Sequence, residues 1–219
     1  MKDADFSLTP DLLLNAYASG IFPMSEGRDD PEIFWVDPRR RGIIPMDGLR
    51  ISRSLAKRMR RGGYEVSLNA DFAGVVDGCA DRPETWINGE IRSQYIALHQ
   101  MGHAHSLEIT VSGRMIGGIY GVSLGAAFFG ESMFSSANDG SKLALVHLVD
   151  HLRRCGYRLF DTQFLTDHLA SLGGIEISRG AYRSQLAIAL QYPAGIDAVP
   201  LDPSPHSVLQ RNAQTSNRG

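Results

Sequence analysis

A glutamate lies between two apolar stretches in the middle of the chain, where a lone carboxylate is unusual. The segment reads Phe128-Phe-Gly-Glu131-Ser-Met-Phe134, and we expect Glu131 at the end of a strand. Burying a carboxylate without a partner costs several kcal/mol, so Glu131 must either pair with a cation inside the fold or await a cation from a ligand. An amino group would suit this position.

A second set of polar residues ends a short strand predicted over 158–163. Asp161 and Gln163 follow the apolar Leu159 and Phe160, and strand alternation places both polar side chains on one face. An aspartate and a glutamine at the mouth of a sheet can orient an amine and hold a carbonyl. The two residues can equally cap a turn, with Gln163 exposed to solvent, and the pattern alone favours this simpler interpretation.

A basic helix is predicted from Ser52 to Gly62. Arg53, Lys57 and Arg61 are spaced four residues apart and share one face, and Arg58 and Arg60 flank them. Such a face can simply be solvated, or it can bind the phosphates of a nucleic acid without reading sequence. Few acidic residues lie nearby in the sequence to neutralise it, which favours phosphate binding modestly.

Three histidines, His99, His103 and His105, resemble a metal cluster at first sight. Only the first two have helical spacing, and Gly102 is expected to break the helix between them. No HExxH pattern and no cysteine pair accompanies them, so we expect structural or surface histidines and no bound metal.

A glycine-rich run extends from Arg114 to Gly121 and has two interpretations. It fits a strand with small residues where another backbone approaches closely. It also faintly resembles the pyrophosphate loop of acetyl-CoA-dependent N-acetyltransferases, which presents backbone N–H groups at a helix N-terminus. Because these glycines lie on a predicted strand and no helix begins directly after them, we do not expect acetyl-CoA binding.

The elements that must position these residues alternate between helices and strands and predict an α+β protein. The middle of the chain reads as an antiparallel meander with turns at Ser112-Gly113-Arg114 and Ser123-Leu124-Gly125. Helices are predicted over 12–19, 52–62, 69–79, 88–102, 141–155, 167–172 and 181–192, and strands over 64–68, 106–111, 115–122, 126–129 and 158–163. We predict a small N-terminal domain over 1–62 with the basic helix, a catalytic domain over 63–192, and a disordered tail over 193–219 that is rich in Pro, Ser, Asn and Gln.

Composition narrows the setting. The net charge of −2 does not predict a nucleic-acid partner, although a local basic patch would suffice for one. Cys79 and Cys155 are far apart with no CxxC, which indicates a reduced, cytoplasmic protein. The acidic start, Met1-Lys2-Asp3-Ala4-Asp5, does not look like a signal peptide, and no apolar run is long enough to span a membrane.

Taken together, many segments resemble the leucyl/phenylalanyl-tRNA–protein transferase family. In chain order these are Ala16-Tyr17, Gly20-Ile-Phe-Pro23, Trp35 with Asp37-Pro38-Arg39, Ile51-Ser-Arg53-Ser54, Gly78-Cys79-Ala80, Thr85-Trp86-Ile87, Leu98-His99, Gly102-His-Ala-His-Ser106, Gly117-Gly118, Tyr120-Gly121-Val122, Gly130-Glu-Ser-Met-Phe-Ser135, Ser141-Lys142, Asp161-Thr-Gln163, Asp167-His168 and Ser171-Leu172-Gly173. An ordered series through most of the chain is far more specific than any single short motif.

The resemblance implies an N-acetyltransferase-like (GNAT) core preceded by a small N-terminal domain. It implies an aminoacyltransferase that takes leucine or phenylalanine, and methionine less well, from aminoacyl-tRNA. The acceptor would be the α-amine of a protein that begins with Arg or Lys, and the product would enter the N-degron degradation pathway. No cofactor and no metal is implied, because an aminoacyl ester is already activated. Nothing in the sequence resembles a heptad seam, and we expect a monomer.

The resemblance also assigns roles to residues. Asp161 would orient or deprotonate the acceptor amine, directly or through Gln163, and Gln163 would help to position the carbonyl. Glu131 would hold the donor's α-ammonium or its terminal adenosine. The apolar donor pocket would be formed by Ile119, Phe128, Met133, Leu145, Leu148 and Phe160. Trp35 and Trp86 would shape the entrance, and Arg53, Lys57, Arg60 and Arg61 would contact the tRNA acceptor stem.

Some positions depart from the family, and other functions compete. Phe34-Trp35 replaces two adjacent tryptophans, and Thr162 stands where other members carry cysteine. One alternative is a small-molecule acyltransferase that uses acetyl-CoA, which the missing phosphate loop argues against. Another is an RNA-binding module without activity, which gives no reason for Glu131 and Asp161. A third is a peptidoglycan-building aminoacyl-tRNA transferase, a class that is usually much longer.

Overall fold

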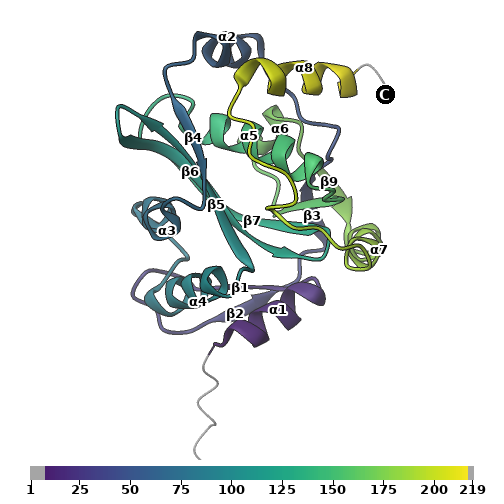
Figure 1. The fold of residues 1–219 in the computed structure, drawn as a ribbon. Helices are drawn as coiled ribbons and strands as arrows, with labels where there is room; N and C mark the ends of the chain where they lie inside the picture. Colours follow the sequence, from purple (N-terminus) through teal and green to yellow (C-terminus); the bar gives the residue numbers. More distant parts are fainter. Residues whose placement is uncertain (1–7, 217–219) are drawn as a thin grey trace, which may run out of the picture.

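The computed structural model describes residues 8–216 and shows one central mixed sheet with helices on both faces (Figure 1). The strands are β1 Phe22–Met24, β2 Phe34–Val36, β3 Arg40–Ile44, β4 Glu65–Leu68, β5 Ala104–Val111, β6 Arg114–Leu124, β7 Ala127–Ser135, β8 Leu159–Gln163 and β9 Ile175–Ser178. The helices are α1 Pro10–Ala18, α2 Arg53–Arg61, α3 Phe72–Ala80, α4 Gly89–Gln100, α5 Gly140–Arg154, α6 Asp167–Ser171, α7 Arg179–Ala189 and α8 Pro205–Ser216. The predicted α+β class is confirmed.

The sheet has the strand order β4-β5-β6-β7-β8-β3-β9, and β1 and β2 form a separate hairpin. The predicted meander is present, since β5, β6 and β7 pair antiparallel in succession. Its first turn is made by Ser112 and Gly113, which both have positive φ, at 51° and 74°. Among the described strands only β7 and β8 pair in parallel, because α5 carries the chain back across the sheet between them.

Each face of the sheet is covered by its own helices. The apolar residues of α1, α3, α4 and α7 pack together with one face, and those of α2, α5 and α8 pack together with the other. Helix α2 and helix α8 lie together at one end of the molecule, and α1, α4 and the β1–β2 hairpin lie at the opposite end (Figure 1). Within residues 8–216, no helix has the length and apolar composition needed to cross a membrane.

Strand β3, which precedes the predicted boundary at residue 62, is an interior strand of the main sheet. It lies between β8 and β9 and pairs antiparallel with both. The sequence did not reveal β3 because four of its five residues are buried, so the expected polar–apolar alternation is missing. One of these buried residues is Arg41, and a charged residue at this position makes the sequence look like a polar loop.

The segment over 193–219, for which composition predicts disorder, contains helix α8, and residues 217–219 lie outside the described part of the chain. Val208 of α8 is buried in the same apolar cluster as α5. Arg211 donates to both carboxylate oxygens of Asp150, at 2.8 and 2.6 Å, and to Asp202 at 2.9 Å. A polar segment can pack on the fold through a few such contacts, and amino-acid composition alone does not predict them.

Candidate active site

A pocket of about 250 Å³ opens where β7 and β8 separate. The two strands pair only from Ala127 to Phe129 on β7 and from Leu159 to Asp161 on β8, and the pocket lies beyond the last pair. It is lined by Phe22, Met24, Arg82, Trp86, Ile119, Gly130, Glu131, Ser132, Met133, Leu145, Phe160, Thr162, Gln163, Phe164, Thr166 and Leu169. Mostly apolar walls with a few polar groups at one side are typical of a small-ligand site.

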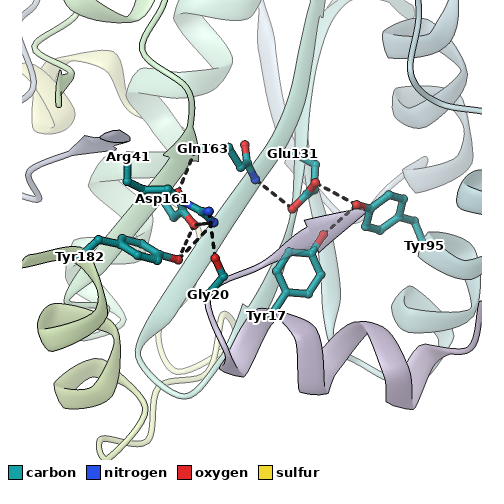
Figure 2. A network of polar contacts seen from close by, with 8 residues as sticks. All are labelled: Tyr17, Gly20, Arg41, Tyr95, Glu131, Asp161, Gln163 and Tyr182. Atoms are coloured by element: carbon teal, nitrogen blue, oxygen red, sulfur yellow. Dashed lines mark hydrogen bonds and ion pairs between the residues drawn. The ribbon is translucent and has the colours of Figure 1, made fainter. Parts of the chain in front are cut away.

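The sequence predicted Glu131 at the end of a strand, but it lies inside β7 and is 9% exposed. The Tyr95 hydroxyl donates to its Oε2 at 2.8 Å, and Gln163 Nε2 donates to its Oε1 at 3.1 Å (Figure 2). Tyr17 adds a further hydrogen bond to this network, because its hydroxyl lies 2.7 Å from that of Tyr95. Burial raises the pKa of Glu131 to about 7 and the charge of Asp161 adds to the rise, while the tyrosine hydroxyls and Arg41 oppose it.

Asp161 is fully buried and is not among the residues that line the pocket. Arg41 donates to both of its oxygens, from Nε at 2.9 Å and from Nη2 at 2.6 Å. The Tyr182 hydroxyl donates to Oδ2 at 2.6 Å, and the backbone N–H of Gln163 donates to Oδ1 at 2.8 Å. A carboxylate has about four lone-pair sites, and these four donors occupy them all. Asp161 therefore has no direct contact with the pocket and is linked to it through the backbone of Gln163.

Sequence reasoning missed Arg41, the cation of this buried pair. Its side chain is 1% exposed and lies between the rings of Phe22 and Tyr182, with its guanidinium carbon 4.7 and 4.4 Å from their centroids. It also donates to the carbonyl of Gly20 at 3.0 Å. Burial alone would lower the pKa of Arg41, but the hydrogen bonds and charge of Asp161 outweigh this and raise it. The buried cation thus pairs with Asp161, whereas Glu131, for which the sequence left open a buried cation or a ligand cation, forms no ion pair among the described residues.

Gln163 has a left-handed backbone, with φ of 56°. The hydrogen bond from its N–H to Asp161 stabilises this conformation, which is unfavourable for a residue with a Cβ. It pairs with Gly42 of β3, where a Cβ would meet the backbone of Phe164 at 2.6 Å, so only glycine fits. The left-handed residue ends the strand alternation. Of the two predicted residues, Gln163 therefore lines the pocket and Asp161 does not.

The predicted apolar donor pocket is assembled in part. Ile119, Met133, Leu145 and Phe160 line it, whereas Phe128 and Leu148 are buried behind it without lining it. The apolar lining residues that the sequence did not suggest come from β1 and from the segment after β8, and they are Phe22, Met24, Phe164 and Leu169. Short segments without periodicity gave no signal for them.

Of the two tryptophans expected at the entrance, Trp86 lines the pocket and Trp35 does not. In the β1–β2 hairpin, Met24 pairs with Phe34 and Pro23 pairs with Trp35. Directly paired residues share a face, so Phe34 lies on the face of Met24 and Trp35 lies on the other. The exposed Phe34 is thus better placed than Trp35 to contact a substrate at the pocket.

The basic helix is confirmed as α2, capped by Ser52, whose side chain accepts from the N–H of Leu55. Leu55 and Met59 are buried against the core. The four residues Arg53, Lys57, Arg60 and Arg61, called here the basic face of α2, are all exposed. Within residues 8–216 none of the four forms an ion pair, so their charge is not neutralised by the protein.

The three histidines have separate structural contacts. His99 stacks on Phe72 with ring centroids 4.3 Å apart, and its Nδ1 lies 2.8 Å from the carbonyl of Ala104. His105 contacts the Asn69 amide through Nδ1 at 3.1 Å. Across the described chain, no three His, Cys, Asp or Glu side chains gather as metal ligands would. Nδ1 of His103 lies 3.4 Å from the carbonyl of Ser123, so all three histidines have contacts within the fold.

Two protein-family models match this chain, each over a different part of it. Residues 43–187 match the family model of leucyl/phenylalanyl-tRNA protein transferase, and residues 6–39 match the model of its N-terminal domain. The gap between the two matched regions, residues 40–42, lies within β3.

Relatives of similar length are also found. The leucyl/phenylalanyl-tRNA–protein transferase of Ruegeria pomeroyi is 64% identical over 96% of this chain and 100% of its own length, and that of Cereibacter sphaeroides (strain ATCC 17025 / ATH 2.4.3) is 60% identical over 96% of this chain and 98% of its own. The solved structure of FemX superposes with a TM-score of 0.51 at 14% identity, covering 80% of this chain and 68% of that one, which shows a shared fold. The chain therefore belongs to the leucyl/phenylalanyl-tRNA–protein transferase family.

Proposed function

We propose that this aminoacyltransferase moves leucine or phenylalanine, and methionine less well, from tRNA to the α-amine of proteins that begin with Arg or Lys. The observation that carries the proposal is the 64% identity, over nearly the whole chain, to a relative named for this reaction. We further propose that it acts in the cytoplasm as a monomer, without cofactor or metal, on a GNAT-like core. The products would be substrates of the N-degron pathway.

The pocket supports an apolar donor side chain. Ile119, Met133, Leu145 and Phe160 form its apolar wall, and Glu131 and Gln163 lie together at one side. An aminoacyl group placed there would bury its side chain against the wall and present its amine and ester to the polar side. One methylene is worth only about 1–3 kcal/mol of discrimination, so a single apolar pocket can accept leucine, phenylalanine and methionine with different efficiency.

The chemistry we propose is aminolysis of the aminoacyl ester. The neutral α-amine of the acceptor attacks the carbonyl carbon, and the ribose oxygen of the tRNA leaves. One amide hydrogen of Gln163 is bonded to Glu131, which leaves the other to donate to the carbonyl oxygen as negative charge develops on it. Asp161 fixes the backbone from which Gln163 reaches the pocket, and positioning of this kind can supply much of the rate.

Glu131 would bind a substrate amine. Among the described residues that line the pocket it is the sole carboxylate, so an ammonium group entering the pocket meets its charge there. The donor's α-amine is one carbon from the reacting ester, and a carboxylate that contacts this amine is also close to the carbonyl. The basic face of α2 would bind the backbone of the tRNA acceptor stem, because its four charges are exposed and not neutralised.

The test is transfer of radiolabelled leucine from Leu-tRNA to peptides that begin with Arg, Lys, Ala or Met. We expect label on the Arg and Lys peptides only. Gln163→Asn keeps a residue that tolerates the left-handed backbone but shortens its reach to Glu131, so this variant should fold and lose most of its activity. A folded wild-type protein that labels none of the peptides while the charged tRNA stays intact would refute the proposed function.

A further inference from the structure

The proposed reaction needs a group that removes a proton from the acceptor. An α-amine has an ordinary pKa of about 8, so at neutral pH most acceptor molecules carry an ammonium group that cannot attack. Asp161 was the residue expected from the sequence to act on this amine. Its carboxylate is closed off, with four donors from Arg41, Tyr182 and the backbone of Gln163 and no exposure to the pocket.

Glu131 differs from Asp161 in each of these respects. It lines the pocket, and the protein supplies it with two hydrogen-bond donors, Tyr95 to Oε2 and Gln163 to Oε1. These two donors and the nearby Tyr17 hydroxyl can occupy at most three of about four lone-pair sites, so at least one remains for a substrate. Figure 2 shows the contrast, with Asp161 enclosed by Arg41 and Tyr182 and Glu131 held from one side by Gln163 and from the other by Tyr95.

We propose that Glu131 is the general base that takes the proton from the acceptor's α-ammonium, and that Tyr95 and Tyr17 position it; this rests on the proposed function. The ammonium transfers one proton to the Glu131 carboxylate and becomes a neutral amine. The amine nitrogen then forms a bond to the carbonyl carbon, and the bond from that carbon to the ribose oxygen breaks. The second proton leaves the nitrogen for the ribose oxygen, and Glu131 returns its proton to solvent through the pocket.

The surroundings of Glu131 suit a base that works near neutral pH. Burial raises its pKa to about 7, and a general base is most effective when its pKa is near the working pH. The groups that face it are Tyr95 on α4, Tyr17 on α1, Tyr120 on β6, Asp161 on β8 and Arg41 on β3, and Arg82 also lines the pocket. The negative charge of Asp161 raises the pKa, whereas Tyr17, Tyr95 and Arg41 lower it.

Tyr95 is the positioning residue whose removal isolates this effect. It is fully buried, and burial raises its pKa well above the ordinary value, so it remains a protonated donor to Glu131. Tyr17 in turn donates to the Tyr95 oxygen. Removing the Tyr95 hydroxyl removes a hydrogen bond that favours the charged form of Glu131. The pKa of Glu131 should then rise by about one unit, as expected for one hydrogen bond to a charged group.

The experiment measures kcat/KM for an Arg-initiated peptide from pH 5.5 to pH 9, at saturating Leu-tRNA, for wild type, Tyr95→Phe, Glu131→Gln and Tyr157→Phe. Tyr157→Phe is the matched control, because it removes the hydroxyl of another buried tyrosine, one bonded to Ser123 and absent from the pocket lining. The acceptor's own titration is common to all four proteins, so differences between the profiles report the enzyme. Circular dichroism confirms that each variant is folded.

We expect the acidic limb to move up by about one pH unit in Tyr95→Phe and to stay in place in Tyr157→Phe. Glu131→Gln should lose activity by about 100-fold or more at pH 7 and keep only the limb of the acceptor amine. An unmoved limb in folded Tyr95→Phe, or Glu131→Gln with near wild-type activity, overturns the assignment while leaving the proposed function intact. A wild-type protein without transfer refutes the proposed function itself.

Discussion

Substituting Glu131 by glutamine should stabilise the protein in a pH-dependent way. The folded carboxyl has a pKa of about 7, against an ordinary value of 4.5, because burial penalises its charge. Between these two values the folded protein holds a proton that the unfolded chain has released. The wild type therefore loses stability as pH rises from 4.5 to 7, and Glu131→Gln, which has no charge to bury, does not. The rise in the pKa of Glu131 on folding corresponds to about 3 kcal/mol in the free energy of unfolding.

The assay is urea unfolding of both proteins at pH 4.5, 6, 7 and 8, followed by circular dichroism. The quantity of interest is the free energy of unfolding of Glu131→Gln minus that of the wild type, because other titrating groups cancel in this difference. It should increase by about 3 kcal/mol from pH 4.5 to pH 8. Glu65→Gln, at an exposed position of β4, controls for the substitution itself. A difference that stays constant within about 0.5 kcal/mol would show that Glu131 carries no burial penalty, and the reasoning about its proton would fail.

Three further predictions concern the rest of the site. Arg41→Leu leaves Asp161 buried without its cation and should lower the free energy of urea unfolding by about 3–5 kcal/mol, and adding Asp161→Leu should recover most of that loss; no recovery would contradict a buried-pair origin. Replacing the four residues of the basic face of α2 by alanine should raise KM for Leu-tRNA. The slope of log KM against log salt concentration should fall by roughly 0.7–0.9 for each phosphate that is no longer neutralised. Arg114→Ala is an exposed control on β6, and equal effects of the two changes would count against tRNA binding by α2. Leu145→Ala enlarges the apolar wall and should change the ratio of kcat/KM for phenylalanine over leucine in favour of phenylalanine by roughly 10-fold, equivalent to about 1–3 kcal/mol; an unchanged ratio would exclude Leu145 from the donor site.

Much of the fold could be predicted because its signals are local. Most of the helices begin at residues whose side chains accept from their own first turn, as Ser52 does for α2 and Asn88 for α4, although α5 has no such cap. The meander follows from strand patterning and from turns that need positive φ. In contrast, β3 could not be predicted, because its partners β8 and β9 lie more than 100 residues away and cover it on both edges. Interior strands of this kind lack the alternation by which strands are recognised.

The candidate site could be predicted in its residue types but not in its geometry. Glu131, Asp161 and Gln163 were all identified as unusual polar residues, and all three are in one buried network. Which of the three side chains lines the pocket depends on Arg41, which is 120 residues before Asp161 and occupies both oxygens of its carboxylate. It also depends on the left-handed backbone of Gln163, which turns that side chain into the pocket when simple alternation predicts otherwise. Neither feature has a signal within a short window of sequence.

The 120 residues between Arg41 and Asp161 also set an order of events during synthesis. At roughly 5–20 residues per second, a ribosome needs about 6 to 24 s to add Asp161 after Arg41. Throughout that interval β3 has neither of its neighbours, and the arginine that will be enclosed between Phe22 and Tyr182 stays in water. The N-terminal hairpin can join the pocket only when β8 and α7 have emerged. Nascent chains that stop before Tyr182 therefore lack the ring that covers one side of Arg41 and one of the four donors to Asp161.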